Sequence, residues 1–495
     1  MNTRRQSGRT AIDSLFLALS AATATLALLL YSLDAGTFES RLVAIVTACI
    51  ASALILVRCR RNLANLLVSM PLLFLLGLTL LNLGQALTEV LGLWDMPIDP
   101  VLRQVYGSVE SLQSKANLCA SLGILCFIAG LMVAAGTRSR IPRVVTEDAM
   151  YLTRMRLFVL FTWCVFLSII VVEGYLLGLF NAAYGKQTYN QLTLSAIQMA
   201  LSSCLLFAAH TDGDKKGSLL LMVICGATYG LLMLLGFRGY SFMFIYGAFT
   251  AWLIGSRFSI KIRHLVVPYI VGSVLWAAVG DFRNADPGQR QYLNAFSNAA
   301  TEWTKSLLYP INLIVGQEVS LRYGILYAQD YGIAPGMAYW KTLPYAVPNL
   351  FVEARKASDA SSISTLVSST YVRSYGLGFT PIAEAYCNGG ILGVCAVMFL
   401  AGVMLQRLQR WFELRQDSRS RVVLGLTLAT TLWWIRNDAI DLIRFFLWGY
   451  VLYLVLRGAA KLFVPARGGG AKSRVLVNPA PSLCRPLPRF SYRSS

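Results

Sequence analysis

Residues Leu219–Gly236 have the sequence LLLMVICGATYGLLMLLG, an apolar run that contains no charged side chain. A helix of about 20 such residues crosses the hydrocarbon core of a bilayer, where a helix or a closed barrel is needed to satisfy the backbone hydrogen bonds. Similar runs recur from near the N-terminus to residue 456. The sequence therefore predicts a membrane protein that is built from helices.

Composition agrees with this prediction, because 56% of the 495 residues are hydrophobic and only 14% are charged. The apolar runs predict an all-α polytopic membrane protein with about 12 transmembrane helices. The predicted spans are Ile12–Leu33, Leu42–Val57, Leu63–Gln85, Ala116–Ala135, Leu157–Leu177, Leu194–His210, Leu219–Gly236, Ser241–Gly255, Leu265–Gly280, Ile382–Leu405, Val422–Ile435 and Ala439–Leu456.

The chain has a formal net charge of +20, and its basic residues concentrate in alternate short loops, as at 58–61, 138–143, 257–263 and 407–421. Short loops rich in Lys and Arg face the cytoplasm. This pattern predicts cytoplasmic N- and C-termini, and it accounts for the positive charge without a nucleic-acid partner. It also predicts four regions, which are 1–280 with nine spans, a large outer loop at 281–379, 380–457 with three spans, and a disordered basic tail at 458–495 that lies beside the lipid bilayer.

The outer loop has three segments with different patterns. Gln291–Tyr309, which includes Trp303, has helical spacing and fits either a helix on the membrane surface or one that packs over the spans. Tyr323–Asn349, which includes Tyr339 and Trp340, is rich in aromatic residues that suit stacking on sugar rings or anchoring at lipid headgroups. Ser358–Thr370 has little to bury and predicts a mobile segment.

The loop ends at a predicted helix start. Thr380 is a suitable N-cap and Pro381 suits the first turn. A helix N-terminus has free N–H groups and a positive dipole end that attract phosphate. Arg373 comes just before this start and Glu384 lies one turn inside it.

Other charged residues lie at the predicted outer ends of spans. Arg238 occupies the short turn GFRGYS, and Arg436 occupies the turn before the last span. Asp438, Asp441 and Arg444 follow at three-residue spacing and share one helical face. Such residues either form an ion-pair set near the hydrocarbon or bind a charged substrate.

Four features carry a resemblance to a known family: Arg238-Gly239 at the start of an outward-facing helix, the long late outer loop, the segment Gly376–Gly393 (GLGFTPIAEAYCNGGILG), and the turn at Arg436. With these features the chain resembles the Wzy-type O-antigen polymerases of the bacterial inner membrane. The resemblance implies a fold related to membrane glycosyltransferases and O-antigen ligases. It also implies that a growing glycan moves from undecaprenyl diphosphate to another lipid-linked repeat unit. Whether a separate chain-length regulator binds the bundle is left open by the sequence.

This resemblance implies roles for particular residues. Arginine binds phosphate oxygens with a fixed fork of donors. The predicted diphosphate-binding residues are Arg238, Arg373, Arg436 and Arg444, followed by Arg283 and Arg290. The predicted catalytic carboxylates are Glu384, Asp438 and Asp441, with an ion pair to an arginine as the other interpretation of Glu384. The predicted glycan contacts are Trp303, Tyr339 and Trp340.

No cluster with metal-site spacing and no nucleotide-binding glycine loop occurs on the predicted outer side, so the sequence predicts a reaction without metal or cofactor. Two other functions remain open. An O-antigen ligase would use the same donor, but no histidine falls on the outer side. A flippase or other transporter would show internal repeats and midplane charges, whereas the charges here gather at one face.

Overall fold

The protein's structure is a computed structural model. It describes residues 2–59, 64–92, 105, 107–135, 149–176, 191–211, 214–235, 237–256, 266, 269–275, 277–278, 292–303, 306–307, 317–333, 335–336, 339–340, 362–372, 378–415 and 417–462.

Helices make up the regular structure of these ranges, and nine of them are long and apolar enough to cross a membrane. The long helices are α1 (Asn2–Ser32), α2 (Thr37–Cys59), α4 (Met70–Val90), α6 (Gln113–Ala134), α7 (Ala149–Leu176), α8 (Gln191–Ala209), α9 (Lys215–Leu234), α10 (Arg238–Ser256), α18 (Pro381–Leu414), α19 (Ser418–Trp434) and α20 (Ala439–Leu462). The shorter helices are α3 (Ala64–Leu67), α12 (Tyr292–Thr301), α14 (Glu318–Tyr331) and α17 (Ile363–Val367).

The all-helical, multi-pass class is therefore confirmed, whereas the number of twelve spans stays a prediction. α10 and α19 are not among the nine candidate spans, since α10 contributes only the short apolar segment Ser241–Gly255 and α19 has 17 residues. Most of the predicted span Leu265–Gly280 lies outside the described residues. The predicted span Leu63–Gln85 is divided into α3 and α4, because the chain turns at residues 68–69.

Two groups of helices form two apolar cores, and α19 belongs to both. One core packs α2, α4, α6, α14 and α18, and it includes Trp434 at the end of α19. The other packs α7, α8, α9, α10 and α20 around Val422, Leu426 and Ala429 of the same helix. The end of α19 therefore lies where the two groups meet.

The two central helices of the first group, α6 and α18, approach each other very closely. A Cβ atom on Gly130 would lie 2.2 Å from the carbonyl oxygen of Phe399, and one on Gly402 would lie 2.3 Å from that of Phe127. Small residues allow this contact between membrane helices. The contact fixes the position of α18 against the bundle.

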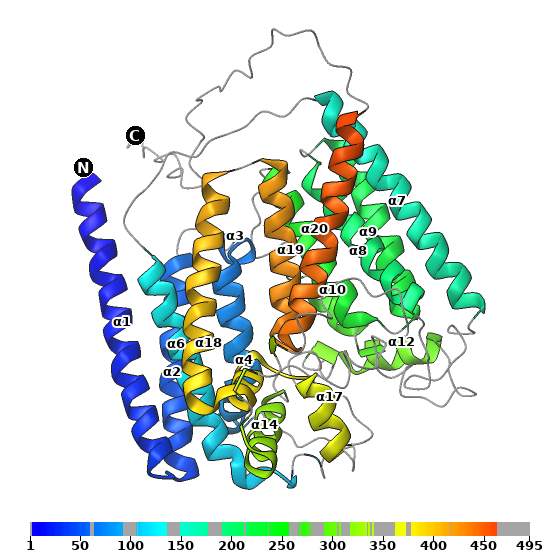
Figure 1. Cartoon of the computed structure of the whole chain (residues 1–495). Coiled ribbons are helices and arrows are strands. Elements are labelled where there is room, and N and C mark those ends of the chain that lie inside the picture. The colour runs from blue at the N-terminus through cyan, green and yellow to red at the C-terminus, as the bar shows by residue number, and fades with distance from the viewer. Residues whose placement is uncertain are drawn as a thin grey trace, which may run out of the picture.

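Three of the shorter helices, α12, α14 and α17, lie at one end of the bundle, shown toward the bottom of Figure 1, which we name the α14 end, whereas α3 lies away from it. α4 ends there at Val90, and α18 and α20 begin there at Pro381 and Ala439. α12 lies across the bundle direction (Figure 1), and its Ala299 packs against Ala277 and Ala278. The described part of α12 agrees with the predicted loop helix.

α18 is broken near its start. Gly389 and Gly390 have non-helical backbone angles, and Gly390 has a φ of 58°, which favours glycine. The carbonyl oxygen of Asn388 accepts a hydrogen bond from the N–H of Gly336 at 3.0 Å. The segment Pro381–Asn388 is therefore a separate short helix at the α14 end, although hydropathy alone predicted one continuous span.

Candidate functional site

The short helix at the start of α18 begins as the sequence predicted. The Thr380 hydroxyl accepts a hydrogen bond from the N–H of Ala383 at 3.2 Å, and Pro381 occupies the first turn. Just before it, the N–H of Phe379 donates to the carbonyl oxygen of Arg436 at 2.8 Å. Gly378 has a φ of 62°, and a Cβ atom there would lie 3.0 Å from the same oxygen. The start of α18 is thereby held against the turn between α19 and α20.

Glu384 lies inside this contact and is buried. Its carboxylate accepts hydrogen bonds from the N–H of Ala439 at 3.0 and 3.2 Å and from the indole N–H of Trp434 at 3.2 Å. An ion pair with an arginine is not among its contacts in the described residues. The carboxylate binds the N-terminus of α20, a favourable place for a negative charge.

Asp438 is the residue directly before Ala439, so the two carboxylates are neighbours. One oxygen of Asp438, Oδ2, accepts from the hydroxyls of Ser362 and Ser364, the latter at 3.0 Å. The other oxygen, Oδ1, is buried and has no hydrogen-bond partner among the described residues. Burial raises the pKa of Asp438, while the bonds from the two serines act in the opposite direction.

The two serines belong to a segment that the sequence predicted to be mobile. Residues 362–372 instead form α17 and one π-helical turn, Ser368–Val372. The Ser362 hydroxyl caps α17 by accepting from the N–H of Thr365, and Ile363 and Val367 are buried. The prediction that this run buries little is wrong for residues 362–370, and 358–361 lie outside the described residues.

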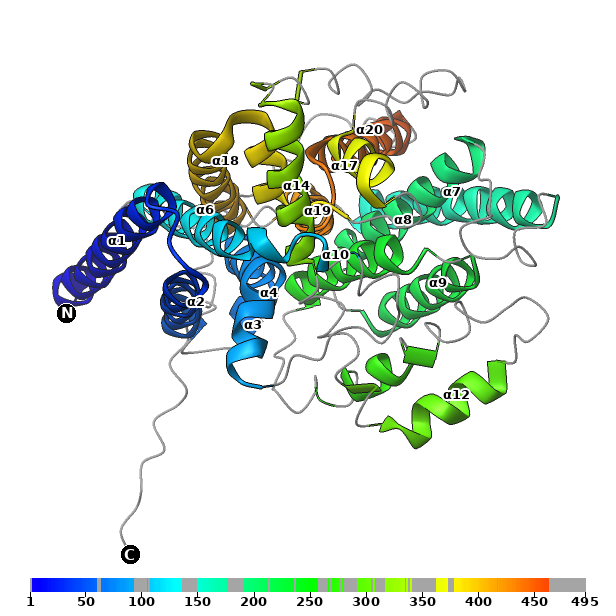
Figure 2. The same cartoon turned by 90° about the horizontal axis from the view of Figure 1, so that it is seen from below.

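The predicted aromatic contacts separate in space. Burial raises the pKa of Tyr339, and the charges of Glu384 and Asp438 raise it further. Tyr339 therefore lies near both carboxylates. Trp340 is 74% exposed and lies against Gly336. Trp303 lies two residues after the end of α12, a helix that Figure 2 shows at the edge of the molecule, away from α14 and α18.

The predicted arginines are described only in part. Arg436 is exposed at the α14 end, and Arg444 lies 3.9 Å from Asp441, which also accepts from the indole N–H of Trp433 at 3.3 Å. α10 begins at Arg238, and its Gly239 packs against the Trp433 ring, so this helix start adjoins the same turn. The side chain of Arg238 and the predicted residues Arg283, Arg290 and Arg373 lie outside the described residues.

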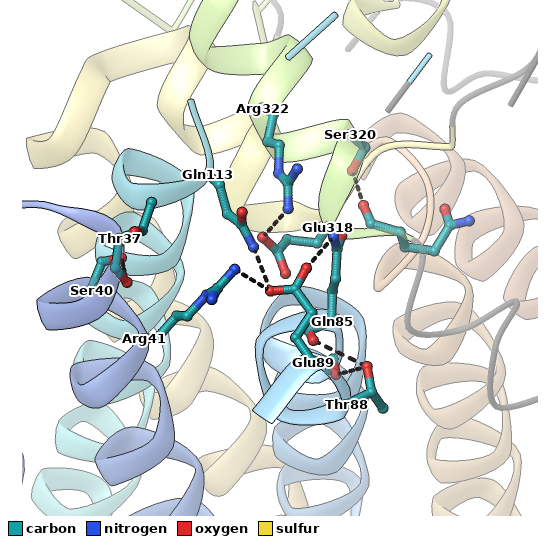
Figure 3. Close-up of polar contacts among 12 residues, drawn as sticks. Thr37, Ser40, Arg41, Gln85, Thr88, Glu89, Gln113, Glu318, Ser320 and Arg322 are labelled. Carbon is teal, nitrogen blue, oxygen red and sulfur yellow. Dashed lines mark hydrogen bonds and ion pairs between the residues drawn. The ribbon is translucent and has the colours of Figure 1, made fainter. Parts of the chain in front are cut away.

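A second polar cluster at the α14 end was not predicted (Figure 3). Glu89 of α4 accepts from Arg41 of α2 at 2.7 Å and from Gln113 of α6 at 2.9 Å. Close by, Arg322 and Glu318 of α14 form an ion pair at 2.9 Å, with side chains only 2% and 0% exposed. We name these four charged residues and Gln113 the charge cluster.

Burial raises the pKa of Glu318 more than the charge of Arg322 lowers it, and Arg41 and Glu89 also act on it. The contacts of Glu89 link α2, α4 and α6 to one another, and the pair on α14 interacts with them through the charges of Glu89 and Arg41. Gly324 lies further along α14, and its carbonyl oxygen accepts a hydrogen bond at 3.4 Å from the thiol of Cys387 in the short helix of α18. α14 thus packs against the short helix that carries Glu384.

The only sequence signal for this cluster was the i,i+4 spacing of Glu318 and Arg322, which predicts a pair on one helix face. Arg41 and Glu89 are isolated charges at the ends of different spans. A single sequence does not show that three distant segments bring them together.

Together these features define a class of protein. The chain is a multi-pass membrane protein in which buried carboxylates, hydroxyls and arginines meet at one end of a helical bundle. A family model described as O-antigen polysaccharide polymerase Wzy matches residues 17–465. The chain belongs to this family of polysaccharide-synthesising membrane proteins, so the resemblance found in the sequence is confirmed. No curated protein and no solved structure matches it.

Proposed function

We propose that the chain polymerises lipid-linked oligosaccharide repeat units at the α14 end. In this reaction a hydroxyl oxygen of one repeat unit attacks the anomeric carbon of the growing glycan. The bond from that carbon to the diphosphate oxygen breaks, and undecaprenyl diphosphate leaves with the electron pair. Membership of the polymerase family, together with the two neighbouring buried carboxylates, carries this proposal.

The proton of the attacking hydroxyl needs an acceptor. Both oxygens of Glu384 accept hydrogen bonds from Ala439, and Oε2 also accepts one from Trp434. Asp438 keeps Oδ1 without a partner among the described residues, and burial raises its pKa toward a range that suits a general base. We therefore assign proton acceptance to Asp438 and the positioning of the α19–α20 turn to Glu384.

The leaving diphosphate needs positive charge. Arg436 is exposed beside the two carboxylates, and Arg238 opens the helix that packs on Trp433. These two arginines are the first candidates for diphosphate binding. Arg444 ranks after them as a diphosphate-binding candidate, because the Asp441 carboxylate already lies 3.9 Å from it. Arg373, Arg283 and Arg290 remain candidates from the sequence. We propose that Tyr339, whose pKa is raised by burial and by the charges of Glu384 and Asp438, contacts the sugar nearest the carboxylates.

The proposal also places the α14 end outside the cytoplasm. Among the described residues, Arg58, Arg156, Arg415 and Lys461 lie at or near the other ends of their helices, where positive charge marks the cytoplasmic side. The expected location is the bacterial inner membrane, with both termini in the cytoplasm and the substrates delivered on the outer leaflet.

A deletion of the gene in its own host tests the function. We expect surface polysaccharide that is one repeat unit long, and plasmid-borne wild-type protein should restore long chains. Asp438→Asn should not restore them at equal protein level. The matched control is Asp34→Asn, because Asp34 lies at the same end in an exposed pair with Lys115. Long chains in the deletion strain contradict the function, and long chains with Asp438→Asn contradict the assignment of the base.

A further inference from the structure

Three tyrosine rings gather at α14, two of them on the helix itself and one from the π-helical turn. The rings of Tyr327 and Tyr331 stack with centroids 4.9 Å apart. Tyr371, from the π-helical turn, donates a hydrogen bond from its hydroxyl to Asp330 at 2.5 Å. We name Tyr327, Tyr331, Tyr371 and Asp330 the tyrosine patch.

The tyrosine patch is partly exposed at the surface, and the residues beneath it are buried in the core. Tyr331 is 65% exposed, and Asp330 is exposed as well. Beneath it, Val367 and Val372 are buried in the same core as α14 and α18. Tyr371 also contacts the buried ring of Tyr323, with centroids 5.7 Å apart. The rings are therefore held in place before any ligand binds.

One continuous segment joins the patch to the proposed reaction site. Ser364 binds Asp438, and Tyr371 follows it seven residues later through α17 and the π-helical turn. At about 1.5 Å per helical residue, the two ends lie on the order of 10 Å apart. A short oligosaccharide spans such a distance. Figure 2 shows α14 and α17 side by side across this end of the bundle.

The chemistry of the patch suits a carbohydrate. Exposed tyrosine rings offer flat apolar faces together with a polar hydroxyl. The Asp330 carboxylate accepts hydrogen bonds from hydroxyl groups. Lipid chains offer no hydroxyl donors, and an exposed carboxylate is costly beside hydrocarbon. A ligand with apolar ring faces and many hydroxyls matches all of these groups.

We propose that the tyrosine patch is a glycan-binding subsite that holds the saccharide chain a few sugars away from the bond being formed. The inference rests on the proposed function, since it assigns the patch to the same substrate. A polymerase that keeps hold of the chain adds more repeats before release, so the patch sets the length of the product.

Tyr331→Ala tests this subsite in the deletion strain and in purified protein. We expect a shorter distribution of chain lengths at equal protein level. We also expect about 3- to 10-fold weaker binding of the host's own polysaccharide, released from its lipid, to the protein in nanodiscs. Tyr331→Phe keeps the ring and should retain most of both properties. Tyr175→Ala is the control, because Tyr175 is 79% exposed on α7 and lies outside the patch.

The outcomes separate the two proposals. Wild-type chain length and binding in Tyr331→Ala would overturn the subsite and leave the polymerase intact. A lower membrane yield with unchanged chain length would assign the ring to the bilayer and also overturn the subsite. If the deletion strain keeps long chains while polysaccharide binding still depends on Tyr331, the polymerase proposal fails and the subsite stands.

Discussion

Replacing Arg322 by methionine removes the cation that accompanies Glu318 inside the protein. The two groups are 2.9 Å apart and almost fully buried. Removing one partner of a buried ion pair costs about 3–5 kcal/mol, because the other charge stays buried without compensation. Arg41 also acts favourably on Glu318, so we expect the lower end of this range, about 3 kcal/mol.

This cost should appear as local detachment of α14. α14 is not among the candidate spans, so it can open while the bundle stays folded. Cys387 reports on this opening, because its buried thiol donates to Gly324 of α14. In a protein with Cys387 as its only cysteine, a maleimide reagent should label Arg322→Met on the order of 100-fold faster than the parent, which corresponds to about 3 kcal/mol.

The matched control is Lys115→Met, which breaks the exposed pair with Asp34 at 3.2 Å. An exposed pair contributes about 0–1 kcal/mol, so labelling should rise by less than about fivefold. The double variant Glu318→Met with Arg322→Met should return close to the parent rate, because no buried charge remains. Equal rates in Arg322→Met and Lys115→Met would refute the role of the charge cluster.

The same variant gives a pH test with a defined sign. Burial raises the pKa of Glu318 in the folded state, so the carboxylate takes up a proton at a higher pH there than in the unfolded state. An acid of this kind stabilises the folded state at low pH, and the stabilisation is lost as pH rises through the folded pKa. The labelling excess of Arg322→Met over the parent, compared at each pH, should therefore shrink on acidification. An excess that grows at low pH would contradict the assignment.

Three further results are expected. Polymerisation by purified protein should fall on acidification with a midpoint above the usual aspartate range, because burial raises the pKa of Asp438 and the base must be ionised; a midpoint below that range counts against it. Thr380→Ala should cost about 1 kcal/mol in a melting experiment, and Thr380→Ser should cost less. Gly402→Leu should abolish membrane yield by separating α6 from α18, whereas Gly458→Leu, which has open space, should not.

The local features of this structure could be predicted from the sequence. Long apolar runs predict helices because a backbone in hydrocarbon must satisfy its own hydrogen bonds. The Thr380 cap and the Pro381 first turn depend only on neighbouring residues, and both are confirmed. The prediction that Asp441 and Arg444 share one helix face needed only their three-residue spacing, and the structure shows these two residues as a pair.

The features that depend on distant residues could not be predicted. α17 is only five residues long, and the contacts of Ser362 and Ser364 with Asp438 join positions more than 70 residues apart. The charge cluster likewise brings together residues from distant segments, because Arg41 pairs with Glu89 and both charges act on Glu318 of α14. The break at Gly389 and Gly390 is invisible to hydropathy, because both glycines lie within an apolar run.

These distant contacts explain why the site lies at the turn after α19. That helix belongs to both apolar cores, so its last residues are held from two sides. Glu384 of the broken α18 binds the N-terminus of α20, and the serines before and within α17 bind Asp438, the residue next to it. Each contact crosses between separate elements, and no single helix could orient both carboxylates. The geometry that the reaction needs is therefore a property of the assembled bundle, which is why the helix break, the charge cluster and α17 occur together at this end.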